Sequence, residues 1–322
     1  MSCVACKCGV SLSDTGFDCT PVQEVTYKLM AVQTFDSTGT RNKIPFTATL
    51  NQAYFDALIN NTDKSKRWYP LPAMKAVEDV RGDNRTEEFP DQTMEFIAEG
   101  ARKFKAWIVG GNAGANSPQM KQLIENIRCG DYSFYIVTVK NQLIGNISTD
   151  GLYLEPIEID EQSISAQFIK KTDTTVQKLQ LTFNWSQIAS DANLRMIDCD
   201  ELGDANLQGL RGLLGVCARI INITYTTLKF SLESVFGTPT SPITADGLVV
   251  TDFVSSVGGA TSKLYNETTT SDVAITGLTE SPDGTYELTF AAQILGDVLV
   301  IKPLKTGYDF TCVEDAPVDI DS

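Results

Sequence analysis

The chain has 322 residues, 42% of them hydrophobic and 21% charged, a composition typical of a soluble globular protein long enough for two domains. Its net charge is −15, and residues 236–322 contribute −10 of it with 3 basic and 13 acidic residues, which argues against a sequence-specific nucleic-acid binder because affinity for phosphates comes mainly from Lys and Arg. The complete absence of histidine excludes Ser-His-Asp and Cys-His nucleophiles and His-ligated metals, so we expect no enzyme and no catalytic residues.

The first 24 residues form a predicted cysteine-rich arm. Its cysteines, at positions 3, 6, 8 and 19, follow the spacing C-x2-C-x-C-x10-C. This is one zinc knuckle, whereas structural zinc sites use two knuckles or a knuckle with histidines. No export signal and no membrane-spanning stretch are apparent, so we expect folding inside a cell, where thiols stay reduced. We therefore predict free thiols, no metal and no cofactor, with a metal site or a disulfide knot as alternatives.

Residues 25–205 are predicted to form the first domain. A strand begins at Val25, a helix is capped by Asn51 and ends at Asn60-Asn61, and a second strand covers 94–109. A further helix is expected from the Ser117 cap to Gly130, because Met120, Leu123, Ile124 and Ile127 are spaced i, i+3, i+4, i+7.

The second half of this domain reads as strands. Residues 134–139 are apolar on both faces except at Thr138, which predicts a strand buried on both sides. A long hairpin follows with its turn at 171–175. The second strand of this hairpin places Leu179, Leu181, Phe183 and Trp185 on one face.

Residues 62–91 show no regular period and are predicted to be a long loop. The loop contains Trp68-Tyr69-Pro70-Leu71-Pro72, in which two aromatic rings and a leucine alternate with stiff prolines. Trp and Tyr are common interface hot spots. We predict an assembly element with Trp68, Tyr69 and Leu71 as contact residues; the alternative is that they cover the core of their own subunit.

Residues 206–216 are predicted to be a linker, and 217–322 a β-sandwich of short strands separated by Gly, Pro, Ser and Thr. Tyr286, Leu288 and Phe290 alternate with polar residues. This run resembles the tyrosine-bearing strand of immunoglobulin-like domains, although Leu288 stands where those domains carry a disulfide cysteine. Cys217 and Cys312 fall near the first and last strands, where we expect buried thiols rather than a bond.

Three other motifs receive structural interpretations. Arg81-Gly82-Asp83 spells an integrin-type tripeptide, for which a solvated turn is the expectation. Glu87-Glu88, and Asp198 with Asp200, lack the dense ligand spacing of a calcium loop and are expected to be solvated. The glycine-rich stretch 110–118 lacks the Lys-Ser/Thr pair of a phosphate-binding loop.

Four segments within residues 10–200 carry a resemblance to a known family: LSDTGFDCTPVQEVTYKL, EFIAEGARKFKAWIVGG, IRCGDYSFYIVTVKNQLIG and FIKKTDTTVQKLQLTFNW. These segments resemble virion structural proteins of tailed bacteriophages that infect Bacteroidetes-type hosts. Followed by an immunoglobulin-like domain, this order is similar to that of tail tube proteins. The resemblance implies a virion tail protein assembled in the host bacterial cytoplasm. It also implies hexameric rings that stack around a channel for genomic DNA, without sequence-specific binding, and contacts with other virion proteins.

The expected fold is therefore mainly β: an α+β, barrel- or sandwich-like tube domain with one or two helices, then an immunoglobulin-like sandwich. An acidic channel wall would let DNA slide. Two other functions stay open: a capsid decoration, collar or baseplate protein, and a carbohydrate-binding adhesin.

Overall fold

The structure is a computed structural model that describes residues 23–109, 118–234, 244, 247–249, 252, 256–257, 260–261, 263–281, 284–303, 305–314 and 318–320. The chain divides into two compact units, Met1–Gly212 and Leu213–Ser322, each with its own core. The division falls inside the predicted 206–216 linker. The predicted N-terminal cysteine arm lies almost wholly outside the described residues, as does the glycine-rich stretch 110–117.

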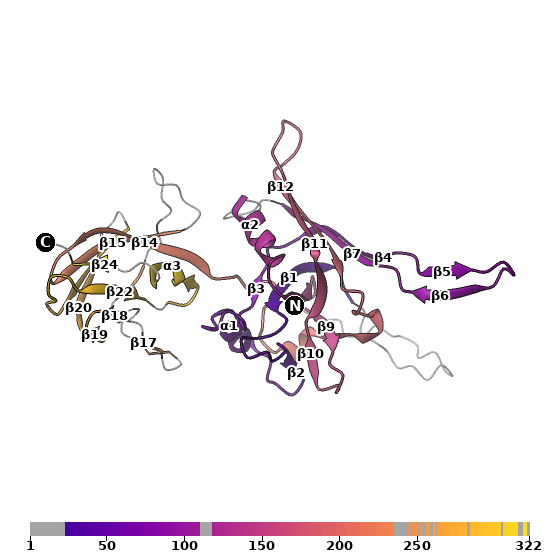
Figure 1. Cartoon of the computed structure of the whole chain (residues 1–322), viewed down its shortest axis with the longest axis horizontal. Coiled ribbons are helices and arrows are strands. Elements are labelled where there is room, and N and C mark those ends of the chain that lie inside the picture. Colours follow the sequence, from indigo (N-terminus) through magenta and orange to yellow (C-terminus); the bar gives the residue numbers. More distant parts are fainter. Residues whose placement is uncertain are drawn as a thin grey trace. The chain divides into compact units, whose positions relative to one another are not determined.

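Unit 1 is built on an 11-stranded sheet that curls into a half-barrel (Figure 1). Its main path runs β2-β10-β9-β8-β11-β12-β7-β4, with β1 pairing β8 and β3, and β13 pairing β9. The strands are β1 (Thr26–Gln33), β2 (Ile44–Pro45), β3 (Tyr69–Pro70), β4 (Lys75–Arg81), β7 (Arg102–Val109), β8 (Tyr132–Thr138), β9 (Leu143–Ile147), β10 (Tyr153–Glu155), β11 (Ile157–Ile169), β12 (Lys178–Trp185) and β13 (Leu194–Ile197).

The core of unit 1 follows the apolar alternation of its strands. In β12 the residues Leu179, Leu181, Phe183 and Trp185 are buried and their neighbours are not, as predicted. Phe183 stacks on Phe104 with ring centroids 4.8 Å apart and meets the Trp185 ring edge-on at 4.9 Å. Strand β8 is buried on both faces, as predicted, but Val139, the last residue of the predicted strand, lies beyond it and is exposed.

The described residues of unit 1 also form two α-helices and two short 3-10 turns. Helix α1 (Gln52–Ile59) begins where the Tyr54 amide donates to the Asn51 side chain at 2.9 Å, which confirms the predicted cap. Helix α2 (Pro118–Ile127) contacts β11 and buries Ile124 and Ile127, but Leu123 of its predicted apolar face is exposed. The turns are η1 (Asp191–Asn193) and η2 (Cys199–Leu202).

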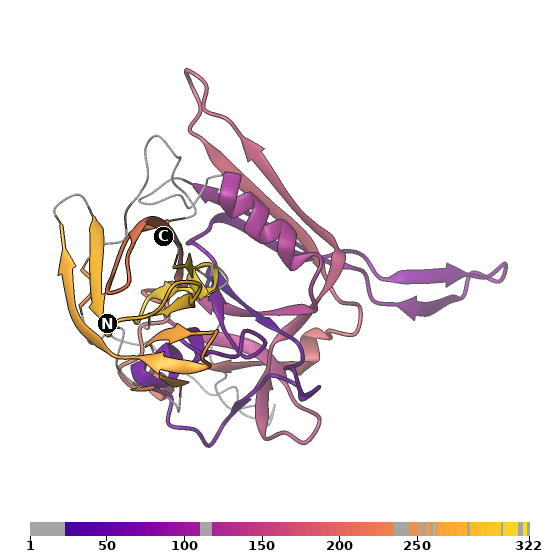
Figure 2. The same ribbon diagram turned by 60° about the vertical axis from the view of Figure 1, so that its left-hand side comes forward.

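Two predictions about residues 62–109 are wrong. The predicted loop 62–91 contains β3, β4 and β5 (Arg85–Glu88). The predicted strand 94–109 is two strands, β6 (Met94–Ala98) and β7, which separate at Gly100. Among the described strands, β5 and β6 pair with each other and with no other strand, and they project well beyond the large sheet, as Figures 1 and 2 show. A two-stranded ribbon with both faces in water has no buried side to impose a period, so its sequence reads as irregular.

Unit 2 is a β-sandwich, so the mainly-β expectation is confirmed. Its described strands form a five-stranded sheet of order β20-β21-β15-β14-β23, a four-stranded sheet of order β19-β18-β22-β24, and a separate β16-β17 pair. Its elements are β14 (Leu214–Ile223), β15 (Thr227–Ser234), β16 (Ser256–Val257), β17 (Ala260–Thr261), β18 (Lys263–Asn266), β19 (Ser271–Val273), β20 (Ile275–Glu280), β21 (Thr285–Phe290), β22 (Val298–Lys302), β23 (Tyr308–Asp309), α3 (Thr311–Glu314) and β24 (Val318–Asp319).

The five-stranded and four-stranded sheets of unit 2 share one core. Tyr286 and Leu288 of one sheet are fully buried together with Leu264 and Leu299 of the other. The buried Tyr286 hydroxyl is satisfied because it donates to Glu280 Oε1 at 3.0 Å. The predicted alternation of this strand is confirmed, with Phe290 also buried.

The expectation of buried thiols in unit 2 is wrong. Cys217 of β14 and Cys312 of α3 form a disulfide with their Cα atoms 4.9 Å apart. Cys312 is exposed and Cys217 half-buried, so neither behaves as a core thiol. Free thiols are expected where cysteines stay reduced, but the fold places these two residues within bonding distance. In unit 1, Cys199 is also disulfide-bonded, and Cys129 is a free, exposed thiol.

Candidate interaction surfaces

The three predicted contact residues lie inside unit 1. Trp68 is 3% exposed and Leu71 is 2% exposed, so neither is available to a neighbouring molecule. The Trp68 ring stacks on Tyr135 at 4.8 Å between centroids. Tyr69 is half-buried, packs on Tyr132, and its hydroxyl donates to the Lys64 carbonyl at 3.2 Å. The burial of Trp68 and Leu71 supports the alternative interpretation, in which this segment covers the core of its own subunit.

The outer side of β4, β7 and β12 forms a face rich in lysine. Cross-strand pairing places Lys75 opposite Trp107, Glu78 opposite Lys105, and Val80 opposite Lys103. Residues that face each other across paired strands lie on the same side of the sheet. Strand β12 adds Lys178, whose Nζ lies 4.2 Å from the Trp107 ring centroid. We call Lys75, Lys103, Lys105, Lys178, Glu78, Val80 and Trp107 the basic face.

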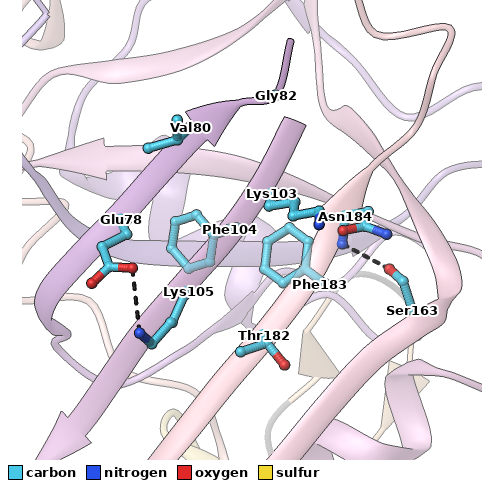
Figure 3. Close-up of a pocket in the computed structure, with 10 residues that line it drawn as sticks. All are labelled: Glu78, Val80, Gly82, Lys103, Phe104, Lys105, Ser163, Thr182, Phe183 and Asn184. Carbon is cyan, nitrogen blue, oxygen red and sulfur yellow. Dashed lines mark hydrogen bonds and ion pairs between the residues drawn. The ribbon is translucent and has the colours of Figure 1, made fainter. Parts of the chain in front are cut away.

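A groove of about 440 Å³ opens in the basic face (Figure 3). It is lined by Glu78, Val80, Gly82, Lys103, Phe104, Lys105, Ser163, Thr182, Phe183 and Asn184. Beside it, the pairing of β11 with β12 is interrupted between Asp160 and Ser165, and the Asn184 amide donates to Ser163 Oγ at 2.7 Å. The groove combines the exposed Val80 with two lysines, a lining suited to an extended acidic segment with apolar side chains.

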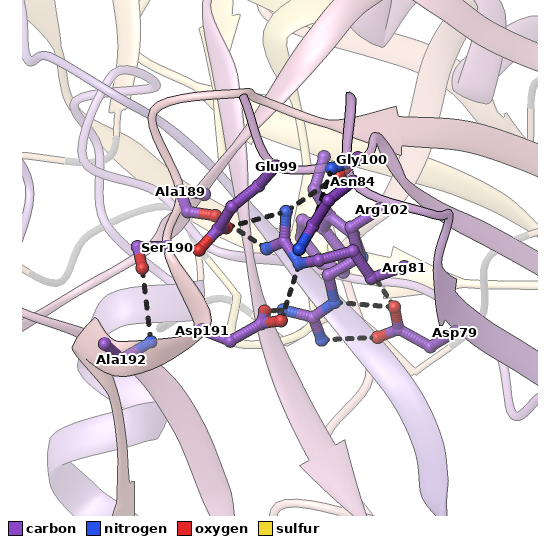
Figure 4. A network of polar contacts seen from close by, with 11 residues as sticks. Asp79, Arg81, Asn84, Glu99, Gly100, Arg102, Ala189, Ser190, Asp191 and Ala192 are labelled. Carbon is purple, nitrogen blue, oxygen red and sulfur yellow. Dashed lines mark hydrogen bonds and ion pairs between the residues drawn. The ribbon is translucent and has the colours of Figure 1, made fainter. Parts of the chain in front are cut away.

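A network of charged groups holds the strand ends where β4 and β7 leave the sheet (Figure 4). Arg102 binds both oxygens of Asp79, at 2.7 and 2.6 Å, and Asp79 also accepts from Trp185 Nε1 at 3.1 Å. Arg81 ion-pairs with Asp191 at 2.7 Å and with Glu99 at 3.1 Å. Bidentate Arg–carboxylate pairs fix orientation as well as adding stability.

The same network gives Arg81, the first residue of the Arg-Gly-Asp tripeptide, a structural role. Besides its two carboxylates, Arg81 donates to the carbonyls of Gly100 at 3.0 Å and Ala189 at 3.2 Å. The hydrogen bond that Arg81 donates to Asp191 lowers the pKa of Asp191 and raises the pKa of Arg81. Arg81 is therefore a structural residue at the end of β4, and the expectation of a solvated turn is wrong for it.

Residues 83–99, between Gly82 and Gly100, make up the projecting two-stranded ribbon. We call this ribbon the arm from here on, as distinct from the N-terminal cysteine-rich segment. The junction is tight, because a Cβ on Gly100 would lie 2.1 Å from the Gly82 carbonyl oxygen. At the tip, the Phe89 amide donates to the Thr93 carbonyl at 2.8 Å, and the Asp91 side chain accepts from the Thr93 amide at 3.0 Å. The arm is thus an ordered hairpin held at its base and its tip.

The arm exposes apolar and acidic side chains together. Met94, Phe96 and Ile97 are 67%, 57% and 60% exposed. Glu87 and Glu95 lie directly opposite each other, an arrangement that destabilises an isolated hairpin. Within the described part of the chain, no ion pair reaches either carboxylate. The arm carries six acidic residues and one arginine, a net charge of −5.

The described residues contain no group of three or more Cys, Asp or Glu side chains placed to hold a metal ion. Asp198 caps η2 in a capping box with Glu201, which explains that part of the Asp198–Asp200 pair. Glu87 and Glu88 are adjacent in β5 and exposed on the arm. Nor does any helix in the described ranges combine the length and apolarity that crossing a membrane requires. The cysteines at positions 3, 6, 8 and 19 lie outside the described residues.

Comparison of the chain with family models, with curated proteins and with solved structures found no match. The chain is a mainly-β protein of two units. Its first unit presents an acidic, partly apolar arm and a basic face.

Proposed function

We propose that this chain is a structural protein of a tailed bacteriophage virion: the tail tube protein, which polymerises as stacked rings around a DNA channel. It is not an enzyme in this proposal. It is assembled in the host bacterial cytoplasm and resides in the virion tail, in contact with other virion proteins. The sequence resemblance motivates the class, and the structure supplies a physical reason for assembly.

The arm is the observation that carries the proposal. A monomer gains nothing in stability from three large apolar side chains on a ribbon that touches no core. Burying a side chain of this size against a partner stabilises by about 1.5–3 kcal/mol. Exposed strand edges and exposed apolar ribbons are hazards for a monomer but serve as contacts in a polymer.

Charge fits the same proposal. The chain carries a net charge of −15. A ring built from such subunits would present a mainly acidic surface, along which DNA moves without binding tightly. The second unit, a sandwich closed by its own disulfide, would then decorate the ring.

Negative-stain electron microscopy of the purified full-length chain tests this proposal. Rings or tubes of uniform diameter are the expected result, together with a high-mass species in sedimentation velocity. Dispersed monomers at all concentrations and salt conditions would overturn it. Monomers that bind glycans in a glycan screen would instead assign the chain to the carbohydrate-binding class.

A further inference from the structure

The arm and the basic face carry opposite charges within one strongly acidic chain. The arm has a net charge of −5. The basic face gathers four lysines and one glutamate, a net charge of +3, on the outer side of three adjacent strands. We infer that the arm of one copy docks on the basic face of a second copy. This inference rests on the proposed function, since it names the contact through which copies join.

The arm does not lie on the basic face of its own molecule. It grows out of β4 and β7, two of the strands that form that face, and it continues outward beyond the sheet (Figure 2). The Asp79–Arg102 and Arg81–Asp191 pairs hold its base in that direction. Glu99 pairs with Arg81 of its own chain, whereas Glu87 and Glu95 have no ion pair within the described residues, so a cationic partner for these two would come from another molecule.

The two surfaces also match in their apolar groups. The basic face offers Val80, which is 63% exposed beside the groove, and the ring of Trp107. The arm offers Met94, Phe96 and Ile97. Docking would bury these apolar groups together and place Glu87 and Glu95 near lysines, which removes the like-charge conflict within the arm.

A contact between two different surfaces of the same chain is head-to-tail. Each copy keeps one free arm and one free basic face after pairing, so the association continues until it closes into a ring or extends as a filament. This symmetry is the one that the proposed function requires, and it differs from a two-fold dimer in which one patch meets itself.

Charge reversal on each surface tests the inference in the full-length chain. The arm variant is Glu87→Lys with Glu95→Lys, and the face variant is Lys103→Glu with Lys105→Glu. The control matched to the face variant is Lys64→Glu with Lys140→Glu, which also changes the net charge by −4 but does so at exposed lysines outside the arm and the basic face. Each surface variant alone should raise the concentration at half assembly by about tenfold or more, while the control assembles like the wild type. Circular dichroism and melting temperature should stay unchanged in all three, because the altered side chains lie on the surface.

A mixture of the two surface variants supplies the decisive measurement. Lysines on one variant's arm then meet glutamates on the other's face, so the mixture should recover assembly into alternating polymers that neither variant forms alone. Recovery in the mixture supports the inference even if the wild type forms no tubes, in which case only the proposed function fails. Unchanged assembly of both variants, with wild-type tubes present, overturns the inference and leaves the function standing. Monomeric wild type together with no association in the mixture overturns both. Binding of duplex DNA that is lost in the face variant, with assembly unaffected, would assign the basic face to DNA and also overturn the inference.

Discussion

Replacing Cys217 and Cys312 with serine should destabilise unit 2 and leave unit 1 unchanged. The bond links residues 95 apart in the sequence. For a closed loop of about 100 residues, the lost chain entropy of the unfolded state corresponds to about 4.7 kcal/mol, and measured costs of removing native disulfides are about 2–5 kcal/mol. Cys312 is exposed and Cys217 half-buried, so serine adds little cavity cost. We therefore expect a loss of about 3–4 kcal/mol in the free energy of unfolding.

Hydrogen exchange followed by mass spectrometry can measure this loss separately in each unit. Amides of β15 and β21 should exchange about 100- to 1,000-fold faster in the double-serine variant, while those of β8 and β12 keep their rates. The three tryptophans, at positions 68, 107 and 185, all lie in unit 1, so the urea transition followed by tryptophan fluorescence should not move. Substitution is preferable to a reductant because Cys199 is also disulfide-bonded. Cys129→Ser, at the free thiol, is the matched control. A change of less than about tenfold in β15 and β21 would refute the reasoning.

Three further predictions concern unit 1. Burial lowers the pKa of Lys28 from 10.5 to about 8. Between pH 8 and 10.5 the unfolded chain therefore binds more protons than the folded chain, so the free energy of unfolding should rise as the pH increases from about 8 to 9.5. Urea titrations followed by tryptophan fluorescence should show this rise in the wild type, and its persistence in Lys28→Met would disprove the assignment. Trp68→Ala should lower the free energy of unfolding by about 3–5 kcal/mol, because it leaves a cavity in the core of unit 1. A loss below about 1 kcal/mol would instead favour Trp68 as a contact residue between subunits. Gly100→Ala should reduce the local stability of the arm by about 1–3 kcal/mol, because the new Cβ would lie 2.1 Å from the Gly82 carbonyl oxygen. Amide hydrogen exchange should therefore be faster in β5 and β6 but not in β8. Exchange rates in the arm equal to those of the wild type would show that the junction adapts freely.

The elements that could be predicted from the sequence are those in which burial imposes a period. Strand β12 alternates because one side packs on Phe104 and the other faces solvent. The Asn51 cap of α1 is a local interaction between residues three apart, and so is visible in the sequence. Strands β5 and β6 have solvent on both sides, and their sequence therefore shows no period.

The candidate site depended on contacts between distant residues, which the sequence does not display. Trp68 follows a segment that looks like a surface loop, yet the neighbouring Leu71 amide donates to the Leu29 carbonyl at 2.8 Å, which draws the segment against β1. The basic face arises because lysines of β4, β7 and β12 come into register only when the strands pair. A signal for the arm was present in the sequence as Met94, Phe96 and Ile97 among acidic residues, but the single-strand interpretation of 94–109 concealed it.

The separation of the arm from the core has an evolutionary consequence. Selection on the side chains of the arm acts through the partner, because the pairs at its base secure its direction whatever sequence lies beyond Gly82 and Gly100. Mutations between those glycines can therefore accumulate with little penalty in folding. Two lineages that exchanged the signs of arm and face together would each remain competent, yet their subunits would no longer assemble with each other in one cell. The arm is thus the place where such lineages would be expected to diverge first.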